Sequence, residues 1–495
     1  MPKAPLAPPA ANATRLDRQE LLWLLAVMLI GASLRLYGLG ARSLWYDEVE
    51  QMAAVRAPWA DLFNMVRVRH LSPPLDFILM RPFVALGQSD AWARAWSAFA
   101  GILAIPAIFL WARAVAGKDG AKLAALLLAT SSFAIAYAQE ARMYSSFLLF
   151  TLLSFYALDQ FQKKRTKATA VIYGLVLGAV FLTHYFGAWL GLLQAPWLLW
   201  SLKKELGWPK ACGLAAISWV LALGLFLPWL PSFLVQLRYT HGAVGFGMPF
   251  KPSSFISLLE QFSSGRSSTW FLGAAFVFAM VQAYRRGDNR VKAVAWIALG
   301  GMVLPLAVSQ FKPNVAPRYL IYFLAPFYLV VASGIAQAAQ RLKHGLLLAG
   351  LVLLAGQLPA ALRDHAQGIN AFKPRWHEAA DLINADPRSA PVAVDEWTDK
   401  VAMGYYIKPW ENHFWPQLSE PLPPKQYRVL VADDALVQRA ERGEWQGWVV
   451  VHFGVNRAPG FDPLAERVRK VAGPPKLHLP SPNESNGVDV YYCGQ

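Results

Sequence analysis

The sequence predicts a polytopic α-helical membrane protein with about 11 transmembrane helices and a small C-terminal α/β domain. Hydrophobic residues make up 55% of the chain and charged residues only 16%, whereas a soluble domain carries about 25% charged residues. The apolar runs approach the roughly 20 residues that a helix needs to cross a bilayer. The loops between these runs are alternately rich and poor in basic residues. Together these observations exclude an ordinary soluble fold.

The predicted spans occupy most of the first 362 residues. The first apolar run is followed by no obvious small-residue cleavage site, so we expect it to be retained as a span rather than removed as a signal peptide. The predicted spans lie near residues 20–38, 92–112, 121–138, 143–161, 168–183, 186–202, 211–230, 269–284, 292–308, 319–338 and 345–362.

Basic residues set the predicted orientation. Residues 1–362 contain 32 basic and 14 acidic residues, whereas residues 363–495 contain 15 and 17. The excess falls in short loops after alternate spans, such as residues 163–167 and 203–210. Because basic loops stay in the cytoplasm, we expect a cytoplasmic N-terminus and a periplasmic or extracellular C-terminal domain. A charge excess placed this way is typical of membrane orientation, and we expect no nucleic-acid partner.

Three regions follow from this orientation. Residues 1–19 form a cytoplasmic tail, residues 20–362 a transmembrane domain and residues 363–495 an outer α/β domain. The outer domain alternates helical stretches with strand-like runs. These runs are PVAVDE, YRVLVAD, GWVVVHFG and VDVYYC.

The first outer loop, residues 39–91, contains helices that we expect to lie in the membrane interface. Residues 48–69 show a helical period that is interrupted at Pro58, which is typical of one or two interfacial helices. Residues 73–87 are apolar but too few to span a bilayer, and they include two charged side chains. We therefore expect a re-entrant or interfacial helix there.

Asp47 and Glu48 are adjacent acids directly after the first span, in SLWYDEVEQMAAV. A carboxylate near an apolar boundary is partly desolvated, which favours its protonated form and suits it to accept a proton. The alternative is structural, because Asp47 could cap the following helix with Glu50 at its N3 position. The pair is the first candidate for a reactive site.

A second candidate lies at the outer turn between the third and fourth spans, in YAQEARMYSS. Glu140 and Arg142, with Tyr144 beside them, place an acid and a base at one tight turn. Ionisable residues at membrane depth are costly unless they are solvated or paired, so they often mark function. The alternative is an ordinary turn from which Arg142 extends to the interface.

Further candidates are predicted on the same side. His184 and Tyr185 form the outer turn in LTHYFGAWL, although a lone His is more often structural than catalytic. Arg318 and Tyr319 begin a later span, where Arg318 could bind an anionic phosphate or anchor a lipid headgroup. His70 precedes a proline-led segment, and prolines are ordinary at the start of a helix.

The candidates would meet at headgroup depth on one face of the membrane. Acids, cations and a re-entrant helix in that place fit a substrate with a lipid tail and an anionic head. The sequence shows no tight spacing of His, Cys or carboxylates typical of Zn²⁺. A divalent metal held by Glu and His from distant segments stays open, and no other cofactor is expected.

The chain resembles the GT-C superfamily of membrane glycosyltransferases. Within it, the similarity is to the bacterial group of protein mannosyltransferases and lipid A aminoarabinose and galacturonic acid transferases. The resemblance covers about residues 20–360 and rests on SLWYDEVEQ, HLSPPLDFILMRPFVALGQSDAWARAWSAFAG, FAIAYAQEARMYSSFLLF, LTHYFGAWLGLLQ and PRYLIYFLAPFYL. Many relatives have His directly before the two prolines, whereas this chain has Ser72 there and His70 two positions earlier.

The resemblance implies an inverting transfer of a sugar from a polyprenyl-phosphate donor. Asp47 would be the catalytic base, and Glu48 would orient it or share its role. Glu140 would be a second acid near the donor or acceptor. Arg142 and Arg318 would neutralise the leaving lipid phosphate, which needs no general acid. The acceptor would be a protein, lipid A or a glycan on the non-cytoplasmic face.

Tyr144 and Tyr319 are assigned to donor binding, and His70, His184 and Tyr185 to the lining of the site. The resemblance implies the bacterial cytoplasmic (inner) membrane as the location. Two other functions stay open, a transporter or flippase of lipid-linked sugars and a ligase of lipid-linked glycans. A transporter places ionisable residues near the bilayer midplane, whereas here they are predicted at the outer edge.

Overall fold

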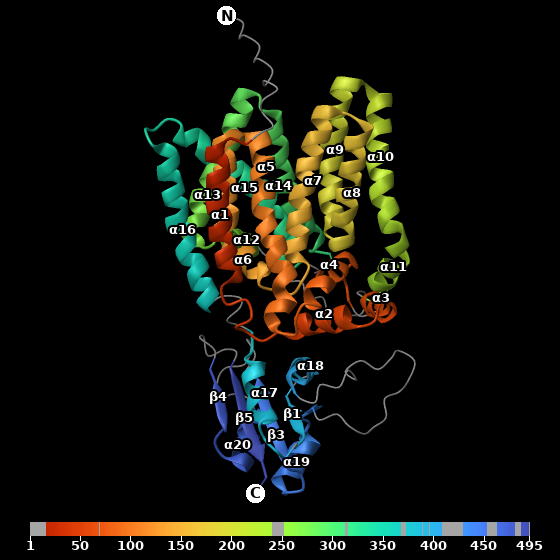
Figure 1. The fold of residues 1–495 in the computed structure, drawn as a ribbon, viewed down its shortest axis with the longest axis vertical. Helices are drawn as coiled ribbons and strands as arrows, with labels where there is room; N and C mark the ends of the chain where they lie inside the picture. The colour runs from red at the N-terminus through yellow and green to blue at the C-terminus, as the bar shows by residue number, and fades with distance from the viewer. Residues whose placement is uncertain are drawn as a thin grey trace, which may run out of the picture.

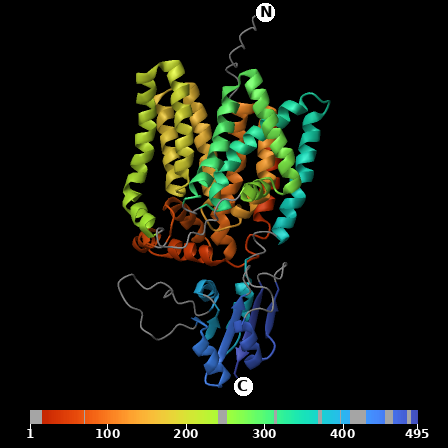
Figure 2. The same cartoon turned by 180° about the vertical axis from the view of Figure 1, so that it is seen from behind.

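The computed structural model shows a helical bundle standing over a small α/β domain (Figure 1). The helix α1 (Arg18–Leu36) begins at the bundle end away from the α/β domain and runs toward that domain (Figure 1). Figure 2 shows the bundle and the α/β domain from behind. The structure describes residues 16–68, 70–239, 252–311, 315–367, 373–388, 390–395, 397–407, 429–452, 463–480 and 487–494.

Most of the bundle helices fall on the predicted apolar runs, whereas α11 and α12 lie between the runs 211–230 and 269–284 and were not predicted. In the described part of the chain, six helices are long and apolar enough to cross a membrane. The polytopic helical fold is therefore as predicted, while the number of crossings stays a prediction. Beside α1, the bundle contains α5 (Asp90–Thr130), α6 (Ser132–Ala138), α7 (Tyr144–Lys164), α8 (Lys167–Thr183), α9 (Gly187–Leu206), α10 (Trp208–Phe226), η1 (Leu227–Trp229), α11 (Leu230–Tyr239), α12 (Pro252–Phe262), α13 (Arg266–Arg286), α14 (Asn289–Val308), η2 (Pro317–Phe323), α15 (Leu324–Ala339) and α16 (Gly345–Gln367).

Two breaks in the backbone shape the second and third predicted spans. The first is at Gly117, with φ 76° and ψ −174°, a conformation that Gly adopts at little cost. The second, which the sequence did not indicate, separates α5 from α6 at Ser131. There the Arg35 guanidinium donates to the carbonyls of Leu128 (2.9 Å) and Ala129 (3.0 Å). A buried cation thus satisfies the carbonyl groups at the end of α5.

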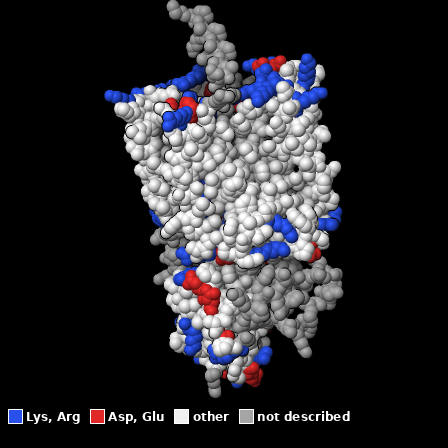
Figure 3. Space-filling view, in the orientation of Figure 1, with Lys and Arg blue, Asp and Glu red and all other residues white. Residues whose placement is uncertain are grey.

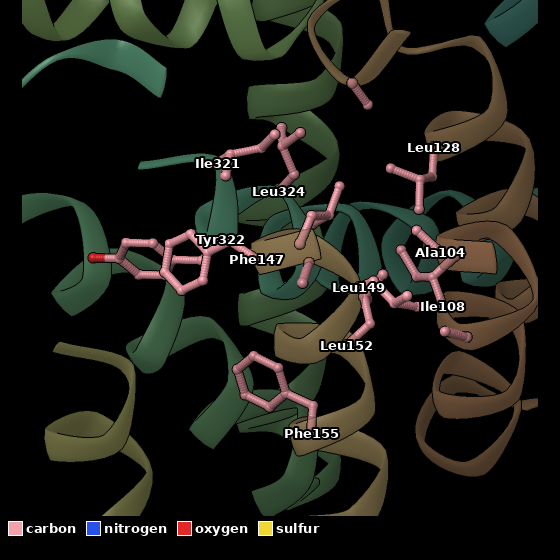
Figure 4. Close-up of a cluster of buried hydrophobic side chains, with 14 of the residues drawn as sticks. Ala104, Ile108, Leu128, Phe147, Leu149, Leu152, Phe155, Ile321, Tyr322 and Leu324 are labelled. Atoms are coloured by element: carbon pink, nitrogen blue, oxygen red, sulfur yellow. The ribbon is translucent and has the colours of Figure 1, made fainter. Parts of the chain in front are cut away.

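The core of the bundle lies around α7. Buried apolar side chains of α7 pack between those of α5 and those at the junction of η2 and α15 (Figure 4). This packing fixes α7 and therefore the turn that precedes it, at residues 139–143. The side chains labelled in Figure 4 are Ala104, Ile108 and Leu128 of α5, Phe147, Leu149, Leu152 and Phe155 of α7, and Ile321, Tyr322 and Leu324.

The first outer loop folds into three short helices, α2 (Tyr46–Arg56), α3 (Trp59–Val68) and α4 (Leu75–Val84). The break between α2 and α3 falls at Pro58, as predicted. Helix α4 has ten residues, too few to cross a bilayer. All three helices lie at the bundle end that faces the α/β domain (Figure 1).

The C-terminal region contains a five-stranded mixed sheet with the strand order β2-β1-β3-β5-β4. Strand β1 is parallel to β2 and β3, while β5 is antiparallel to β3 and β4. The four strand-like runs of the sequence contain β1, β2, β3 and β5, and β4 was not predicted. The elements are α17 (Trp376–Asn384), β1 (Val392–Val394), α18 (Trp397–Tyr406), β2 (Val429–Val431), α19 (Asp434–Glu441), β3 (Gly447–His452), α20 (Pro463–Ala472), β4 (Leu477–Leu479) and β5 (Val488–Cys493).

Charged side chains gather at two rims of the bundle, and a mostly uncharged band separates them (Figure 3). Lys and Arg are dense at the end opposite the α/β domain. We call this end the far rim and use five of its residues below, Glu20, Arg113, Asp159, Lys163 and Arg290. We call the end that faces the α/β domain the near rim, with Asp47, Glu48, Glu140, Arg142 and Arg318.

Candidate active site

Glu48 is the most completely bound acid of the near rim. Its side chain is fully buried, and Arg94 of α5 binds both of its oxygens, with Nε–Oε1 2.8 Å and Nη2–Oε2 2.9 Å. The Lys373 ammonium lies 2.9 Å from Oε2, and the Ala141 amide donates to Oε1 at 2.8 Å. Burial alone would raise the pKa of Glu48, but Arg94 and Lys373 lower it to about 2. Glu48 is therefore an ionised anchor.

Glu48 also fixes the start of α2. The helix begins at Tyr46 with Trp45 as its N-cap, and the Trp45 amide donates to Glu48 Oε2 at 3.3 Å. Glu48 thus occupies the N3 position that the capping interpretation gave to Glu50. The expectation that Asp47 caps this helix is wrong, because Asp47 lies inside the first turn.

Asp47 is held much more loosely than its neighbour. Its side chain is 24% exposed, and Arg318 Nη2 lies 3.9 Å from Oδ2. Arg142 Nη1 donates to the backbone carbonyl of Asp47 at 3.5 Å. Asp47 therefore presents a partly exposed carboxylate beside two guanidinium groups.

A buried chain of hydrogen bonds supports Arg142. Arg142 Nη1 donates to Gln51 Oε1 at 3.1 Å, and Gln51 Nε2 donates to Asp76 Oδ2 at 2.8 Å. Asp76 also accepts from Ser146 (2.6 Å) and Trp96 (3.0 Å), and its burial in α4 raises its pKa. Neither Gln51 nor Asp76 was among the residues predicted to form the site. An acid inside an apolar ten-residue segment was the signal that could have found Asp76.

Glu140 lies in the turn after α6 and is only 2% exposed. Its Oε1 accepts no hydrogen bond from the described residues. Burial raises the pKa of Glu140, while the nearby Lys373, Arg318 and Arg142 oppose this rise. A buried acid with an uncommitted oxygen is uncommon and is suited to bind a polar ligand group.

An aromatic wall completes the site beside Arg318. The Arg318 guanidinium lies 5.6 Å from the ring centroids of both Trp45 and Tyr319. The His184 ring lies 5.3 Å from that of Tyr319 and 6.2 Å from that of Tyr144. Burial, together with the nearby guanidinium groups, lowers the pKa of His184 to about 3. His184 is therefore a neutral member of the wall.

The other two predicted lining residues make structural contacts. Tyr185 turns toward η1 and α11, and its hydroxyl pairs with Gln236 of α11 and accepts from Trp229 Nε1 of η1 at 3.0 Å. His70 is buried and packs edge-on against Phe77, with 4.9 Å between the ring centroids. These contacts give both residues a role in packing the outer loop.

The α/β domain contributes to the near rim, although none of the predicted site residues lies in that domain. Three residues of this domain contact the start of α2. His377 and Tyr406 bind the segment between α1 and α2, and Lys373 binds Glu48 in the first turn of α2. The contacting partners are separated by 325 to 362 residues. No local spacing links positions so far apart, so these contacts become visible only in the fold.

The side chains of the site favour acid–base and electrostatic chemistry. The near rim brings together two incompletely bound carboxylates, a neutral imidazole and three guanidinium groups. Among the described residues, no group of three or more His, Cys, Asp and Glu side chains is placed to hold a metal ion.

Comparison with known sequences gives one family and several relatives. Residues 72–231, less than half of the chain, match the family described as dolichyl-phosphate-mannose-protein mannosyltransferase. Undecaprenyl phosphate-alpha-4-amino-4-deoxy-L-arabinose arabinosyl transferases from Pseudomonas paraeruginosa and Pseudomonas aeruginosa are 25% and 26% identical over 340 residues. Each match covers 63% of this chain and 59% of the relative. The chain thus spans about three fifths of the length of these curated relatives.

Comparison with solved structures gives the same fold. ArnT from Cupriavidus metallidurans in the apo state has a TM-score of 0.61 at 14% identity, covering 95% of this chain and 98% of that one. The same protein bound to undecaprenyl phosphate has 0.59 at 14%, covering 96% and 98%. The archaeal oligosaccharyltransferase AglB from Archaeoglobus fulgidus has 0.56 at 11%, covering 97% and 74%. Together, these matches show that the chain is similar to membrane glycosyltransferases of the GT-C superfamily and has their fold, as the resemblance predicted.

Proposed function

We propose that this protein transfers a sugar from a polyprenyl-phosphate donor to an acceptor on the non-cytoplasmic face of the bacterial inner membrane. The observation that carries the proposal is the contrast between two adjacent acids. Glu48 is bound by Arg94, Lys373 and two backbone amides, whereas Asp47 is 24% exposed and only loosely paired with Arg318. A carboxylate held in place but left open is suited to accept a proton from a substrate.

The cations beside Asp47 fit a phosphate leaving group. Arg318 and Arg142 converge on Asp47, one at its carboxylate and one at its backbone carbonyl. Arg binds phosphate through a planar fork of donors, and the Nε of each of these residues has no partner among the described residues. The relative that was solved with undecaprenyl phosphate supports a lipid phosphate as the group that these cations bind.

The proposed reaction is a single displacement at the anomeric carbon. Asp47 takes the proton of the acceptor hydroxyl while the oxygen of that hydroxyl forms a bond to the anomeric carbon. The bond from the same carbon to the phosphate oxygen breaks, and its electron pair stays on the polyprenyl phosphate. Arg142 and Arg318 stabilise the charge that develops there. Attack opposite to the leaving group inverts the anomeric configuration.

The remaining predicted residues take supporting roles in this proposal. Glu140, with one uncommitted oxygen, binds a hydroxyl of the donor sugar or the acceptor. Tyr144, Tyr319 and His184 form an apolar wall for the donor. Glu48 positions Asp47 through the first turn of α2 instead of exchanging protons itself.

The proposed orientation rests on the distribution of charge. Lys and Arg are dense at the far rim (Figure 3), and basic loops stay in the cytoplasm. The near rim and the α/β domain then face the periplasm or the extracellular side. Acceptors available there are proteins, lipid A and glycans.

Transfer and transport are distinguished by the fate of the donor. The purified protein in lipid discs is given polyprenyl-phosphate sugars with a labelled sugar and a panel of acceptors, and products are identified by mass. We expect labelled acceptor and free polyprenyl phosphate. In vesicles, movement of intact donor between leaflets, with no cleavage of any donor in the panel, would instead support a flippase and overturn the proposal.

A further inference from the structure

The α/β domain contacts residues 43–48, which lead into α2 and form its first turn, at three points. The Tyr406 hydroxyl accepts from the Leu44 amide at 2.6 Å. The His377 amide donates to Ser43 Oγ at 3.0 Å, and the His377 ring lies 2.5 Å from the same oxygen. These contacts lie in the three residues before α2 and its Asp47, so the domain is attached to the segment that carries the proposed base.

The third contact goes through Lys373, which is only 5% exposed. Its Nζ lies 2.9 Å from Glu48 Oε2 and 3.5 Å from the Gln139 carbonyl. Arg94 already binds both oxygens of Glu48, so a second cation is not needed to neutralise that acid. Burying an ammonium group is costly, and its presence here calls for a further role.

That role follows from the position of Lys373 between two parts of the site. One side holds Glu48 at the start of α2, and the other holds the turn that contains Glu140. We propose that Lys373 is a positioning residue, through which the docked α/β domain fixes the first turn of α2, which contains Asp47, against the turn that contains Glu140. This inference rests on the proposed function, because it assigns the domain a part in that reaction.

The α/β domain has two tasks in this arrangement. Tyr406 binds the Leu44 amide and His377 binds the Ser43 side chain, both in the segment before α2. Lys373 links Glu48 in the first turn of α2 to the turn that contains Glu140. Tyr406 also donates to Asp90 at 2.7 Å, which ties the same domain to the start of α5. The docked domain therefore holds three segments of the bundle in one arrangement.

Electrostatics gives a readout that distinguishes positioning from general stability. The charged and titratable groups that influence Glu140 are Lys373, Glu48, Arg318 and Arg142, and Tyr137 and Tyr144 also lie near it. Lys373 is the strongest of the attractions that oppose the effect of burial on Glu140. Removing its charge would move the protonation of Glu140 to higher pH.

The test compares Lys373→Met with Lys373→Arg and with a matched control, Arg375→Met. Arg375 lies two positions away and pairs locally with Glu378. We expect Lys373→Met to lower kcat about tenfold or more, to change the donor KM by less than about threefold, and to move the acid limb of the pH profile upward. These magnitudes correspond to the loss of one charge-assisted hydrogen bond. Lys373→Arg should restore most of kcat, and Arg375→Met should behave like the wild type.

A second readout does not depend on transfer. Hydrogen exchange of the amides in residues 42–48 should become faster in Lys373→Met but not in Arg375→Met. Unchanged exchange in Lys373→Met overturns the inference, whether or not the protein transfers sugar. A wild type without transfer, but with the expected exchange, would instead contradict only the proposed function.

A milder variant covers the case in which Lys373→Met does not fold. Tyr406→Phe keeps the ring and removes only the hydroxyl that binds Leu44 and Asp90. We expect a several-fold loss of kcat and faster exchange at Leu44. Normal kcat and normal exchange in this variant would overturn the role of domain docking.

Discussion

The two charged rims of the bundle differ in how completely their acids are bound. At the far rim, Glu20 pairs with Arg113 at 2.7 Å, and Asp159 pairs with Arg290 and with Lys163. At the near rim, Glu48 is saturated, but neighbouring acids are not. Asp47 lies 3.9 Å from Arg318, and one oxygen of Glu140 has no partner among the described residues.

This difference distinguishes charged side chains that stabilise the fold from charged side chains that can bind or react with a substrate. Buried polar groups are nearly always paired, because an unpaired one costs free energy. The buried acids Glu20 and Asp159 are paired at the far rim, whereas Asp47 and Glu140 are incompletely paired at the near rim. This contrast indicates that a ligand binds at the near rim. The predictions below test that distinction.

Asp47→Asn should have the largest effect on transfer. The amide cannot accept the proton of the acceptor, and we expect kcat to fall by about 10³-fold or more. The Tm should stay close to that of the wild type, because Asp47 makes only a loose ion pair. Turnover is measured with a labelled donor, and Tm by thermal unfolding in detergent. Turnover within twofold of the wild type would falsify the assignment of Asp47 as the base.

Arg318→Met should be next in size. It removes the guanidinium that faces Asp47 while keeping a long apolar side chain against Trp45 and Tyr319. Loss of one group that stabilises developing charge lowers kcat by about 10²- to 10³-fold. Arg318→Lys should recover part of this loss, since it keeps the charge but not the fork. Equal kcat values for Arg318→Met and Arg318→Lys would contradict the role of Arg318 in phosphate binding.

Glu140→Gln should lower activity while raising stability. Loss of a charge-assisted hydrogen bond to substrate lowers turnover by about 10- to 100-fold. Because burial raises the folded-state pKa of Glu140, the fold favours its protonated form. Stability is therefore lost as the pH rises through that pKa, and the neutral Gln should increase the Tm at neutral pH. The measurement is the Tm against pH for both proteins, and a lower Tm in the variant would contradict this account of Glu140.

Glu20→Gln at the far rim should have the smallest effect on activity. Glu20 is 1% exposed and pairs with Arg113, so the variant weakens a buried ion pair and should lower the Tm by a few degrees. Turnover per folded molecule should stay within about twofold of the wild type, because the far rim takes no part in the proposed reaction. A large loss of kcat without a change in Tm would show that the rims are coupled.

The sequence predicted the helical bundle because most of its helices depend on local composition. Runs of apolar residues specify helices wherever they occur, and Pro58 marked the break between α2 and α3. The break at Ser131 was missed because it depends on Arg35 from another helix, which binds the carbonyls of Leu128 and Ala129. A local pattern carries no information about such a contact.

The sequence identified several residues that the structure brings together at the candidate site, but it did not indicate how each of them is bound. Asp47, Glu140, Arg142 and Arg318 do share one rim, and the order of motifs was enough to find them. The saturation of Glu48 by Arg94 and Lys373 could not be predicted, because it joins three segments that are distant in the sequence. Gln51 and Asp76 were missed for the same reason, since their importance lies in the hydrogen bonds that connect them to Arg142.

The central claim is a single displacement in which Asp47 acts as a base. The most direct test is the anomeric configuration of the product, determined by nuclear magnetic resonance after transfer from a donor of known configuration. The account predicts complete inversion, because the acceptor oxygen attacks opposite to the leaving phosphate. Retention of configuration would require an intermediate and a second displacement, and it would contradict the role proposed for Asp47.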